Sequence, residues 1–530
     1  MLSGRSGLKE LLLNFAQMLE THARLRPTRL GARDLERSLS FAQWNSRANR
    51  LANSLVALGL EKGDRVGVLA YNCLEWAEIY AATAKSGIVA VPVNFRLSSP
   101  EIGYILQDAG VSAVIAQDEL HPLIDAIRPA LDLPESRYVH FGGKSTPHGW
   151  SDYEALIAAA RDGRPGAIVL PDDPWTLMYT SGTTGNPKGV IRSHRGMAML
   201  ALVTELEVGI GPDDDALLVM PMCHANSLNF FCSFSYCGGT VTIYSRRNFD
   251  PAHALDVLGR IGSTFTSLVP THYIMLLGLS SREKQVHDLG RMKKLMISSA
   301  AARADTKRAI MEMFPSSGLF ELYGSSEAGW VTMLHPHEQF THLGTVGREC
   351  IGSGPIRLLD DAGNEVPDGQ PGELFSQTPY TFNGYWNQPD KTREAFNDQA
   401  CTVGDMAVRD EDGFIRLVDR KKNMIISGGE NIYPSEVEAV LGSCPQVRDV
   451  AVIGVPDDKW GEAVHAVIVL HDGETPDENA ILQWCNGRIA GYKKPRSVTF
   501  ICEQDMPRTA TGKVLHRVLR DQLGTSPQEA

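Results

Sequence analysis

The chain has 530 residues, more than one hydrophobic core usually supports, so we expect two or more domains. Hydrophobic residues make up 43% and charged residues 22%, an ordinary globular composition that argues against disorder. The formal net charge of −12 excludes a global basic field that would hold nucleic acid or an anionic membrane. A local basic pocket for a phosphorylated small molecule stays open.

Nine cysteines are scattered from Cys73 to Cys502 without a CxxC pair. This pattern favours reduced thiols over a disulfide framework or a cysteine-based metal site. The N-terminus has no apolar core followed by a cleavage site of small residues, and no apolar run approaches the roughly 18 residues of a membrane helix. We therefore expect a cytoplasmic protein without an integral membrane segment.

The first part of the chain alternates helical and strand patterns. Two amphipathic helices are predicted, over Leu8–Leu25 and Ser40–Leu58, and the acidic residues of the first favour a docked helix over an import peptide. The patterns that follow are the strands Arg65–Ala70, Gly87–Val93 and Val111–Ala116 and the helix Trp76–Lys85. Alternation of this kind predicts a parallel α/β sheet.

A connector rich in Pro, Gly and Asp, Pro165–Pro174, precedes a second set of α/β units. Its predicted strands are Trp175–Thr180, Ala216–Met220, Gly239–Tyr244, Thr264–Leu268 and Lys294–Ser298. From Gly344 to Leu417 short strands and glycine turns predict a β-rich subdomain. The residues after Asp419 and Arg420 are predicted to form a smaller α/β segment, with a helix over Glu436–Leu441 and a strand over Val447–Val455.

We therefore predict an α/β fold with two domains. Residues 1–419 are expected to form a large domain of two parallel-type α/β sheets plus the β-rich subdomain. Residues 420–530 are expected to form a small C-terminal α/β domain.

The most distinctive stretch is the loop that follows the strand ending at Thr180. It reads Thr180, Ser181, Gly182, Thr183, Thr184, Gly185, and then Lys188 after Asn-Pro. Glycines allow backbone N–H groups to surround an anion, while hydroxyls and a lysine suit phosphate. A Walker loop is excluded because Pro187 precedes Lys188 and Gly189 follows it. Alone, the stretch is also compatible with a polar surface turn.

Three further polar clusters each have two interpretations. In Glu321–Gly329, Tyr323 offers a face for stacking a base, and Ser326 and Glu327 offer hard oxygens for Mg²⁺, but a serine-capped helix start fits equally well. Asp405, after a glycine, suits a ribose diol or a common turn. Lys513, after a Gly/Thr turn, is alone most simply a solvated lysine.

The order and content of these four segments resemble the adenylate-forming superfamily of acyl-CoA synthetases, adenylation domains and firefly luciferases. The resemblance covers the chain from about Phe15 to Arg520. Its most specific parts are residues 180–189, 323–327, 419–432 and 507–513. Departures such as Val403 in place of the usual threonine remove no charged catalytic group.

The resemblance implies which residues bind ATP and AMP. The Thr180–Lys188 loop would hold the β- and γ-phosphates, Tyr323 would stack on adenine, and Glu327 would hold Mg²⁺ with Thr184 as a further ligand. The whole implied nucleotide set is Thr180, Ser181, Gly182, Thr183, Thr184, Gly185, Lys188, Ala300, Ala301, Glu321, Leu322, Tyr323, Gly324, Ser326, Asp405, Arg420 and Lys513.

The remaining implied roles concern the two half-reactions. Lys513 matches the lysine essential for adenylation, carried on a small mobile domain that reorients about Lys422. His224 matches a catalytic position near the acyl carboxylate, with a hydrogen-bonded structural histidine as the alternative. Gly428 and Gly429 would line the channel for coenzyme A. The acyl pocket would draw on His224, Asn226, Ser227, Ser299, Gly329 and Trp330, with Phe230, Phe231, Met275 and Leu276 along an apolar tube.

The resulting expectation is an AMP-forming acid–thiol ligase that uses ATP, Mg²⁺ and coenzyme A. It would convert a carboxylic acid to an acyl-AMP and then to an acyl-CoA. A medium- or long-chain fatty acid is favoured, and an aryl or arylpropenoic acid is the main alternative. A stand-alone adenylating enzyme with another acceptor and an inactive nucleotide-binding regulator remain as further alternatives. No nucleic-acid partner is expected, and a homodimer is left open.

Overall fold

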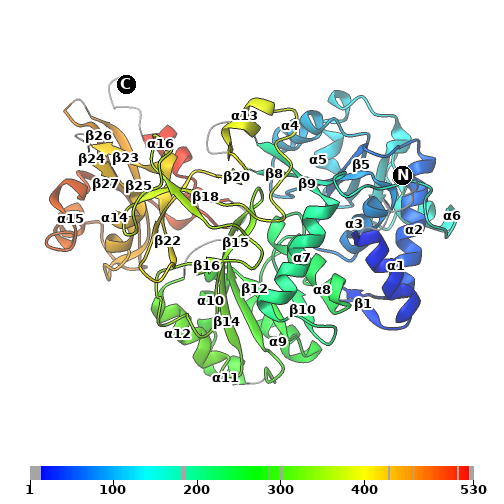
Figure 1. Cartoon of the computed structure of the whole chain (residues 1–530), viewed down its shortest axis with the longest axis horizontal. Helices are drawn as coiled ribbons and strands as arrows, with labels where there is room; N and C mark the ends of the chain where they lie inside the picture. Colours follow the sequence, from blue (N-terminus) through cyan, green and yellow to red (C-terminus); the bar gives the residue numbers. More distant parts are fainter. Residues whose placement is uncertain are drawn as a thin grey trace, which may run out of the picture. The chain divides into compact units, whose positions relative to one another are not determined.

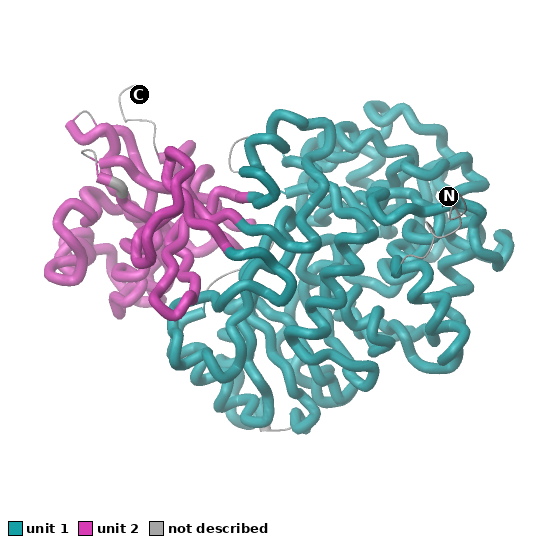
Figure 2. Tube along the Cα trace, viewed as in Figure 1, with its two compact units in different colours: residues 1–355, 376–401 teal, residues 356–375, 402–530 magenta. Residues whose placement is uncertain are grey.

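The structure is a computed structural model that describes residues 13–180, 187–285, 287–298, 302–427, 430–457, 459–509 and 512–523. The chain divides into two compact units (Figure 2). Unit 1 comprises Met1–Pro355 and Ser376–Cys401, and unit 2 comprises Ile356–Phe375 and Thr402–Ala530. The expected boundary after residue 419 therefore falls inside unit 2, because part of the β-rich segment packs with the C-terminal residues.

The first sheet of unit 1 has seven strands in the order β7-β6-β5-β3-β4-β8-β9, of which β5, β8 and β9 are labelled in Figure 1. All neighbours are parallel except β8 and β9, which form an antiparallel hairpin. The strands are β3 (Arg65–Leu69), β4 (Val89–Val93), β5 (Ala113–Gln117), β6 (Tyr138–Phe141), β7 (Ser151–Asp152), β8 (Pro174–Thr180) and β9 (Lys188–Ser193). The predicted parallel sheet is confirmed, and the antiparallel β9 is an addition to it.

The second sheet of unit 1 has nine strands in the order β16-β15-β14-β13-β12-β10-β11-β1-β2. Its central neighbours are parallel, and antiparallel strands close both edges. The strands are β1 (Leu30–Arg33), β2 (Ser38–Ser40), β10 (Asp215–Leu218), β11 (Thr240–Ile243), β12 (Phe265–Leu268), β13 (Lys294–Ser298), β14 (Gly318–Ser325), β15 (Gly329–Leu334) and β16 (Arg348–Glu349). A short pair, β19 (Phe396–Asn397) and β20 (Ala400–Cys401), also belongs to this unit.

Helices connect these strands and bury their apolar faces. They are α1 (Phe15–Leu25), α2 (Phe41–Ala57), α3 (Glu75–Ser86), α4 (Ser99–Ala109), α5 (His121–Asp125), α6 (Tyr153–Ala159), α7 (His194–Val208), α8 (Ala225–Cys237), α9 (Pro251–Ile261), α10 (Pro270–Leu277), α11 (Ser281–Gln285), α12 (Ala304–Met313) and α13 (Pro389–Glu394). None of the described helices combines the length and the apolar character needed to cross a membrane.

The ends of the first two helices follow from their capping residues. Asn14 accepts a hydrogen bond from the Gln17 backbone and starts α1, and the predicted start at Leu8 lies outside the described residues. Ser40 and Gln43 form a capping box at the start of α2, which begins at Phe41, one residue after the predicted start of this helix. The buried faces of α1 and α2 meet at Phe15 and Trp44, whose ring centroids are 5.9 Å apart.

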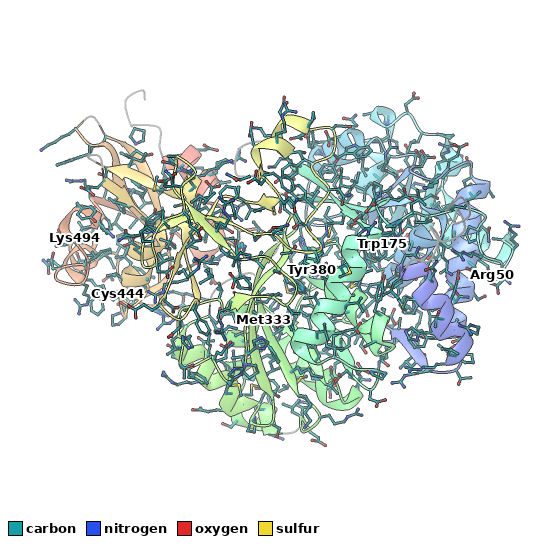
Figure 3. The ribbon with its side chains drawn as sticks, in the orientation of Figure 1. Arg50, Trp175, Met333, Tyr380, Cys444 and Lys494 are labelled. Atoms are coloured by element: carbon teal, nitrogen blue, oxygen red, sulfur yellow. The ribbon has the colours of Figure 1, made fainter. Side chains whose placement is uncertain are left out.

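Aromatic side chains fill the interior of unit 1 between its elements. Trp175 on β8 and Tyr380 are fully buried among the packed side chains drawn in Figure 3. The Trp175 indole donates to the Tyr80 carbonyl at 3.1 Å, so burial does not leave its N–H unpaired. Strand β8, which leads into the glycine-rich loop, is therefore anchored in the core.

Unit 2 contains two sheets. An antiparallel sheet, ordered β17-β18-β21-β22, is built from β17 (Arg357–Leu359), β18 (Gly372–Phe375), β21 (Asp405–Arg409) and β22 (Ile415–Arg420). A second sheet, ordered β24-β23-β26-β25 with β27 beside β26, is built from β23 (Ile425–Ser427), β24 (Glu430–Ile432), β25 (Val447–Asp457), β26 (Gly461–Leu470) and β27 (Ser497–Phe500). The helices are α14 (Pro434–Leu441), α15 (Glu478–Trp484) and α16 (His516–Leu523). The predicted helix at Glu436 and strand at Val447 are confirmed.

Gly347 provides a test of the close packing at the edge of the nine-stranded sheet. Its φ is +91°, and a Cβ added there would lie 2.0 Å from the carbonyl oxygen of Met333 on β15. We expect Gly347→Ala to lower the free energy of unfolding by at least about 2 kcal/mol, because both the backbone conformation and the neighbouring chain oppose a side chain. Denaturant unfolding measures this loss.

The matched control is Gly166→Ala. A Cβ at Gly166 meets nothing within 4 Å, and its φ lies outside the positive range. This substitution should change stability by less than about 0.5 kcal/mol. Equal effects of the two substitutions would contradict the packing argument.

Candidate active site

The glycine-rich loop is the tip of the β8–β9 hairpin. Thr180 and Lys188 are paired across the two strands, which fixes both ends of the loop at the same level of the sheet. The loop residues Ser181, Gly182, Thr183, Thr184 and Gly185 lie outside the described residues. Their predicted contacts with phosphate stay predictions.

Strand β9 is covered by the segment around Tyr385. The Trp386 N–H donates to the Gly189 carbonyl at 2.7 Å, and the Ile191 N–H donates to the Gly384 carbonyl at 3.0 Å. A short antiparallel bridge pairs Val190 with Tyr385 itself. Backbone pairing therefore brings a segment almost 200 positions further along the chain to the base of the loop.

Tyr385 links two of the predicted site residues. The Lys188 ammonium lies 3.9 Å from the centroid of the Tyr385 ring, and the Tyr385 hydroxyl donates to Glu327 Oε1 at 2.9 Å. The Phe382 N–H also donates to the Glu327 carbonyl, at 2.8 Å. Lys188 and Glu327 are thus brought together through a residue that the sequence analysis missed. The aromatic run around Tyr385 carries no charge or glycine pattern that marked it as a site.

The segment around Glu327 is a β-hairpin turn between β14 and β15. The Ala328 N–H donates to Ser325 Oγ at 2.9 Å, and Ser325 pairs with Gly329 across the strands. The alternative of a serine-capped helix start is therefore wrong, because the antiparallel pairing of β15 closes the turn first. Leu322, Tyr323 and Gly324 lie on the last part of β14.

Arg192 on β9 is a second residue that the sequence analysis missed. Its side chain is buried, and Nη1 donates to the Ser326 carbonyl at 2.7 Å. Burial lowers the pKa of the Arg192 guanidinium to about 10. The buried charge fixes the turn that carries Ser326 and Glu327. An arginine within a strand pattern gave no sequence signal for this role.

Glu321 is engaged in a buried ion pair. Its carboxylate contacts the Lys307 ammonium of α12, and both side chains are almost fully buried. Burial raises the pKa of Glu321, and the charge of Lys307 opposes that effect. The ion pair connects α12 to β14, so the predicted nucleotide contact of Glu321 remains a prediction for a residue that already has a structural partner.

The predicted acid-binding residues His224, Asn226 and Ser227 lie at the start of α8. Asn226 Nδ2 donates to Ser298 Oγ at 2.8 Å at the end of β13, and Ser227 Oγ donates to the Met220 carbonyl at 2.6 Å. His224 Nε2 and Asn226 Oδ1 are buried without a hydrogen-bond partner in the described part of the chain. Burial, followed by the charge of Arg96, lowers the pKa of His224 to about 4. Near neutral pH His224 is therefore an uncharged hydrogen-bonding group.

The adenine-side residues Ser299, Ala300 and Ala301 follow β13 directly and lie outside the described residues. Their predicted places beside adenine and the acid stay predictions. Ser298, which holds the Asn226 amide, is the last residue of β13 and thus ties α8 to the start of this segment.

Gly329 and Trp330 begin β15, and Trp330 belongs to the packed interior. Its ring centroid is 5.3 Å from that of Phe230, and its indole N–H donates to Thr204 Oγ1 at 2.8 Å. Phe231 packs on Phe15 at 5.4 Å. Phe230 and Phe231 are completely buried in these aromatic clusters, and the apolar tube predicted along them stays a prediction.

Unit 2 brings together three of the predicted site residues. Asp405 and Arg420 are paired across β21 and β22, and Arg420 Nε donates to Asp405 Oδ1 at 3.1 Å. Burial, followed by the charge of Arg420, lowers the pKa of the Lys513 ammonium, and the charge of Asp405 opposes this effect. The backbone N–H of Lys513 donates to Thr509 Oγ1 at 3.1 Å.

The predicted hinge residue Lys422 is also in unit 2, and its carbonyl oxygen accepts a hydrogen bond from Arg520 Nη1 at 3.1 Å. Gly428 and Gly429 lie outside the described residues, so their predicted contact with coenzyme A is undecided.

The family model described as "AMP-binding enzyme" matches residues 19–386 of the chain. The model described as "AMP-binding enzyme C-terminal domain" matches residues 436–513. The chain belongs to the AMP-binding enzyme family. This confirms the resemblance drawn from the four motifs. The family match also spans the hairpin, the Glu327 turn and Tyr385.

Individual AMP-binding enzymes resemble the chain over nearly its full length. A feruloyl-CoA synthase from Amycolatopsis sp is 35% identical over 504 residues, covering 95% of this chain and 97% of the relative. The long-chain-fatty-acid–CoA ligase FadD13 from Mycobacterium tuberculosis is 34% identical, with 92% and 94% covered. The crystal structure of the anthranilate CoA ligase AuaEII with anthranoyl-AMP superposes with a TM-score of 0.86 at 28% identity, covering 96% and 97%. The expected enzyme class, an acid–thiol ligase, agrees with these matches.

Tyr385 offers a test of the link between Lys188 and Glu327. Tyr385→Phe removes the hydroxyl that donates to Glu327 Oε1 but keeps the ring against Lys188. Because an oriented carboxylate is a better metal ligand than a free one, we expect the Mg²⁺ concentration for half-maximal pyrophosphate release to rise about tenfold. A magnesium titration with saturating ATP measures the change.

Tyr492→Phe is the matched control, since Tyr492 is an exposed tyrosine of unit 2. It should leave the magnesium dependence unchanged. An unchanged magnesium dependence in Tyr385→Phe as well would contradict the predicted role of Glu327 as a magnesium ligand oriented by this hydroxyl.

Proposed function

We propose that this chain is an ATP-dependent acid–CoA ligase that activates a carboxylic acid with a compact aromatic body. The supporting observation for the chemistry is the connected set Lys188, Tyr385 and Glu327 at the base of the glycine-rich loop. The relatives with CoA ligase names support the reaction class. The buried aromatic packing beside α8 supports the substrate class.

The proposed reaction has two steps. A carboxylate oxygen of the acid attacks the α-phosphorus of ATP, the new O–P bond forms, and the bond to pyrophosphate breaks. The thiolate of coenzyme A then attacks the acyl carbon, the C–S bond forms, and AMP leaves with the electron pair of the C–O bond. Activation is needed because a free carboxylate has no good leaving group, whereas an acyl-AMP has AMP.

The residues of the chain reduce the repulsion between two anionic reactants. Lys188 would bind the phosphates that depart, and its position against the Tyr385 ring holds the ammonium at the loop. Glu327, oriented by the Tyr385 hydroxyl, and Thr184 would hold Mg²⁺, which supplies further charge neutralisation when bound with ATP. The hard oxygens of Glu327 fit that ion. The backbone contact of Arg192 keeps the turn in place during this step.

The start of α8 would bind the acid. His224 Nε2 and Asn226 Oδ1 are buried polar atoms that still need a partner within the described chain, and such atoms are costly unless a ligand satisfies them. With its lowered pKa, His224 would act as a neutral group that orients the substrate. This agrees with the sequence expectation and disfavours the structural alternative, in which both ring nitrogens would be bonded.

Unit 2 would supply the nucleotide-binding pair and the adenylation lysine. Asp405 would bind the ribose hydroxyls with Arg420 beside it, and Lys513 would act in the first half-reaction. The three groups lie on β21, β22 and the turn before α16, within a single compact unit. Reorientation of the small domain about Lys422 remains part of the proposal.

An aromatic acid fits better than the fatty acid favoured by the sequence. Phe230 packs against Trp330 and Phe231 packs against Phe15, and this close aromatic packing supports a short pocket over a long channel. The feruloyl-CoA synthase and the anthranilate CoA ligase among the relatives support the same choice. A medium- or long-chain fatty acid is the second candidate, favoured by the similarity to FadD13 and by the exposed Ile274 and Met275 of α10.

An acid panel tests the proposed function and separates the two substrate classes. The purified chain with Mg-ATP and coenzyme A should release pyrophosphate and form acyl-CoA with ferulic or anthranilic acid. We expect kcat/KM to be at least about tenfold higher than with octanoic or palmitic acid, which corresponds to roughly 1.4 kcal/mol of selectivity. The reverse order would support the fatty-acid candidate. Absence of both products with every acid would overturn the ligase proposal.

Lys513→Ala tests the separation of the two half-reactions. We expect the rate of acyl-AMP formation to fall by at least about 100-fold, because the positive charge stabilises the transition state of adenylation. This rate is measured as pyrophosphate release. Thioester formation from preformed acyl-AMP should be largely retained. Lys494→Ala, at a lysine of unit 2 that bonds to Asn486, is the matched control and should leave both steps unchanged. Equal loss in both half-reactions would contradict the assigned role.

A further inference from the structure

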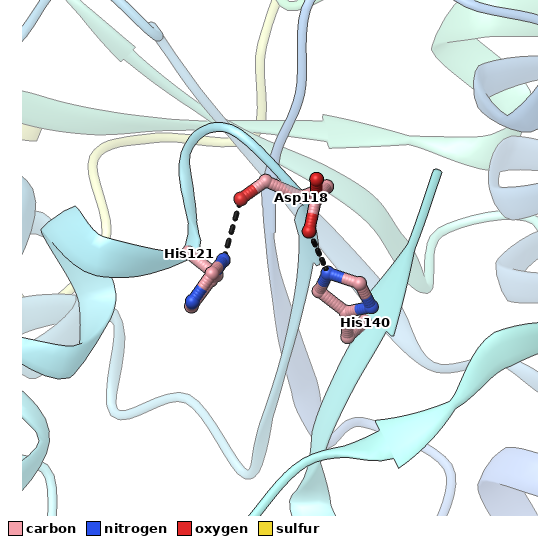
Figure 4. Close-up of side chains that lie close together, drawn as sticks. All are labelled: Asp118, His121 and His140. Atoms are coloured by element: carbon pink, nitrogen blue, oxygen red, sulfur yellow. Dashed lines mark hydrogen bonds and ion pairs between the residues drawn. The ribbon is translucent and has the colours of Figure 1, made fainter. Parts of the chain in front are cut away.

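A cluster of side chains that the ligase chemistry does not use lies at one edge of the seven-stranded sheet (Figure 4). It consists of Asp118, His121 and His140. Each side chain can offer one metal-ligating atom, and the three atoms lie within 4.8 Å of one another. Asp118 directly follows β5, His121 opens α5, and His140 lies on β6. The edge where parallel strands end is the usual ligand-binding edge of such a sheet.

Backbone hydrogen bonds hold the three residues in register. Within the sheet, His140 is paired with Ala116, two residues before Asp118. The Asp118 N–H donates to the Phe141 carbonyl at 2.8 Å. The cluster is therefore placed by the strand pairing of β5 and β6 and by the tight turn into α5, and little rearrangement is needed to bring the ligand atoms together.

Each of the two imidazoles has an oxygen atom of Asp118 beside it. His140 Nε2 lies 2.8 Å from Asp118 Oδ1, so one cation could bridge these atoms after a small increase in their separation. His121 Nδ1 contacts the Asp118 carbonyl oxygen, and His121 Nε2 lies 3.7 Å from Asp125 Oδ2. Each ring nitrogen of His121 thus has an oxygen near it, Nδ1 at hydrogen-bond distance and Nε2 at ion-pair distance. Metal-bound histidines are typically oriented in this way.

Asp125 is itself held in place. Its Oδ1 accepts from the Trp150 indole at 3.0 Å and from Arg128 at 3.3 Å. The carboxylate is thereby available to orient His121 without being free to turn away. Its contact with Arg128 also makes Asp125 a poorer direct ligand than Asp118.

The surroundings leave one side of the cluster open to water. The side chain of His140 is only 2% exposed, whereas that of Asp118 is 42% exposed. The Trp150 ring packs against both imidazoles, at centroid distances of 5.8 and 6.2 Å. Gly143 passes so close that a Cβ there would lie 2.5 Å from Asp118 Oδ1, so the backbone at Gly143 covers one side of the carboxylate. The exposed side of Asp118 is where an ion and a water molecule would bind.

We propose that Asp118, His121 and His140 bind a Zn²⁺ ion, with water as the fourth ligand. Two imidazoles and one carboxylate are ligands that zinc accepts in tetrahedral geometry, while Mg²⁺ and Ca²⁺ prefer sites made of oxygen alone. The ion would clamp the turn after β5 to β6 and stabilise the first sheet. It takes no part in the two half-reactions, so the proposal stands independently of the ligase function.

Zinc binding is tested on the full-length chain after removal of metals with a chelator. Competition with a chromogenic zinc indicator should detect one site per chain, and Zn²⁺ should raise the melting temperature. His121→Gln and Asp118→Asn should each weaken binding by at least about tenfold and remove the thermal shift. His148→Gln, at an exposed histidine on the same segment after β6, should bind zinc as the unmodified chain does.

Two outcomes of this experiment would overturn the proposal. One is no zinc uptake by the unmodified chain under conditions where the indicator releases the ion. The other is unchanged uptake in His121→Gln, which would place the zinc elsewhere. Co²⁺ substitution separates a cysteine site from the proposed one, because a thiolate-to-cobalt charge-transfer band would contradict a site of nitrogen and oxygen ligands.

Trp150 provides a local reporter for the same site. Paramagnetic Co²⁺ bound at the cluster should quench the fluorescence of this nearby indole among the eight tryptophans of the chain. In Trp150→Phe that quenched component should disappear while Co²⁺ still binds. Identical quenching in Trp150→Phe would show that the metal lies at another place.

Discussion

The pairing of β9 with the segment that carries Tyr385 is the constraint on which the candidate active site of unit 1 depends. Strand β9 is an outer strand of the seven-stranded sheet, and its free edge would otherwise expose unpaired backbone groups. The hydrogen bonds at Gly189 and Ile191 cover that edge and bring Tyr385 to Lys188. The same tyrosine reaches Glu327 on a turn of the other sheet. A backbone requirement thus assembles three side chains from distant parts of the sequence.

Buried polar groups divide into two kinds in this molecule. Lys307 and Glu321 form a buried ion pair that connects α12 to β14, so the desolvation of each charge is offset by the opposite charge. His224 and Asn226 each present a buried atom whose partner is not found in the described chain. The first kind builds the framework, and the second kind marks where a ligand would complete the hydrogen bonding.

The zinc cluster lies at β5 and β6, towards the other end of the strand order from β8 and β9. At the cluster two parallel strands end together, whereas the glycine-rich loop joins two antiparallel strands. The ligand atoms also differ: a glycine-rich loop with a lysine suits phosphate, whereas two imidazoles and a carboxylate suit a transition metal. Chemical type, as well as position in the fold, distinguishes the two proposals.

The sequence by itself determined the α/β class, most strands and helices, and membership of the AMP-binding enzyme family. These features depend on local signals, namely apolar periodicity, capping residues such as Ser40, and motifs such as the loop from Thr180 to Lys188. Four candidate site residues, Lys188, Glu327, Asp405 and Lys513, could also be named because their residue types stand out in polar motifs, and Arg420 could be named from the resemblance to the family.

Only the tertiary structure decided what depends on pairing between distant segments. It showed that β9 returns antiparallel to β8, and that the Glu327 turn is a hairpin rather than a helix start. It also placed Tyr385 beside Lys188, and Phe230 within the aromatic core. The same is true of Asp118 and His140, which are 22 positions apart and meet only because β5 pairs with β6. Strand register and side-chain packing are set by contacts that no local stretch contains, and this is why the sequence could not supply them.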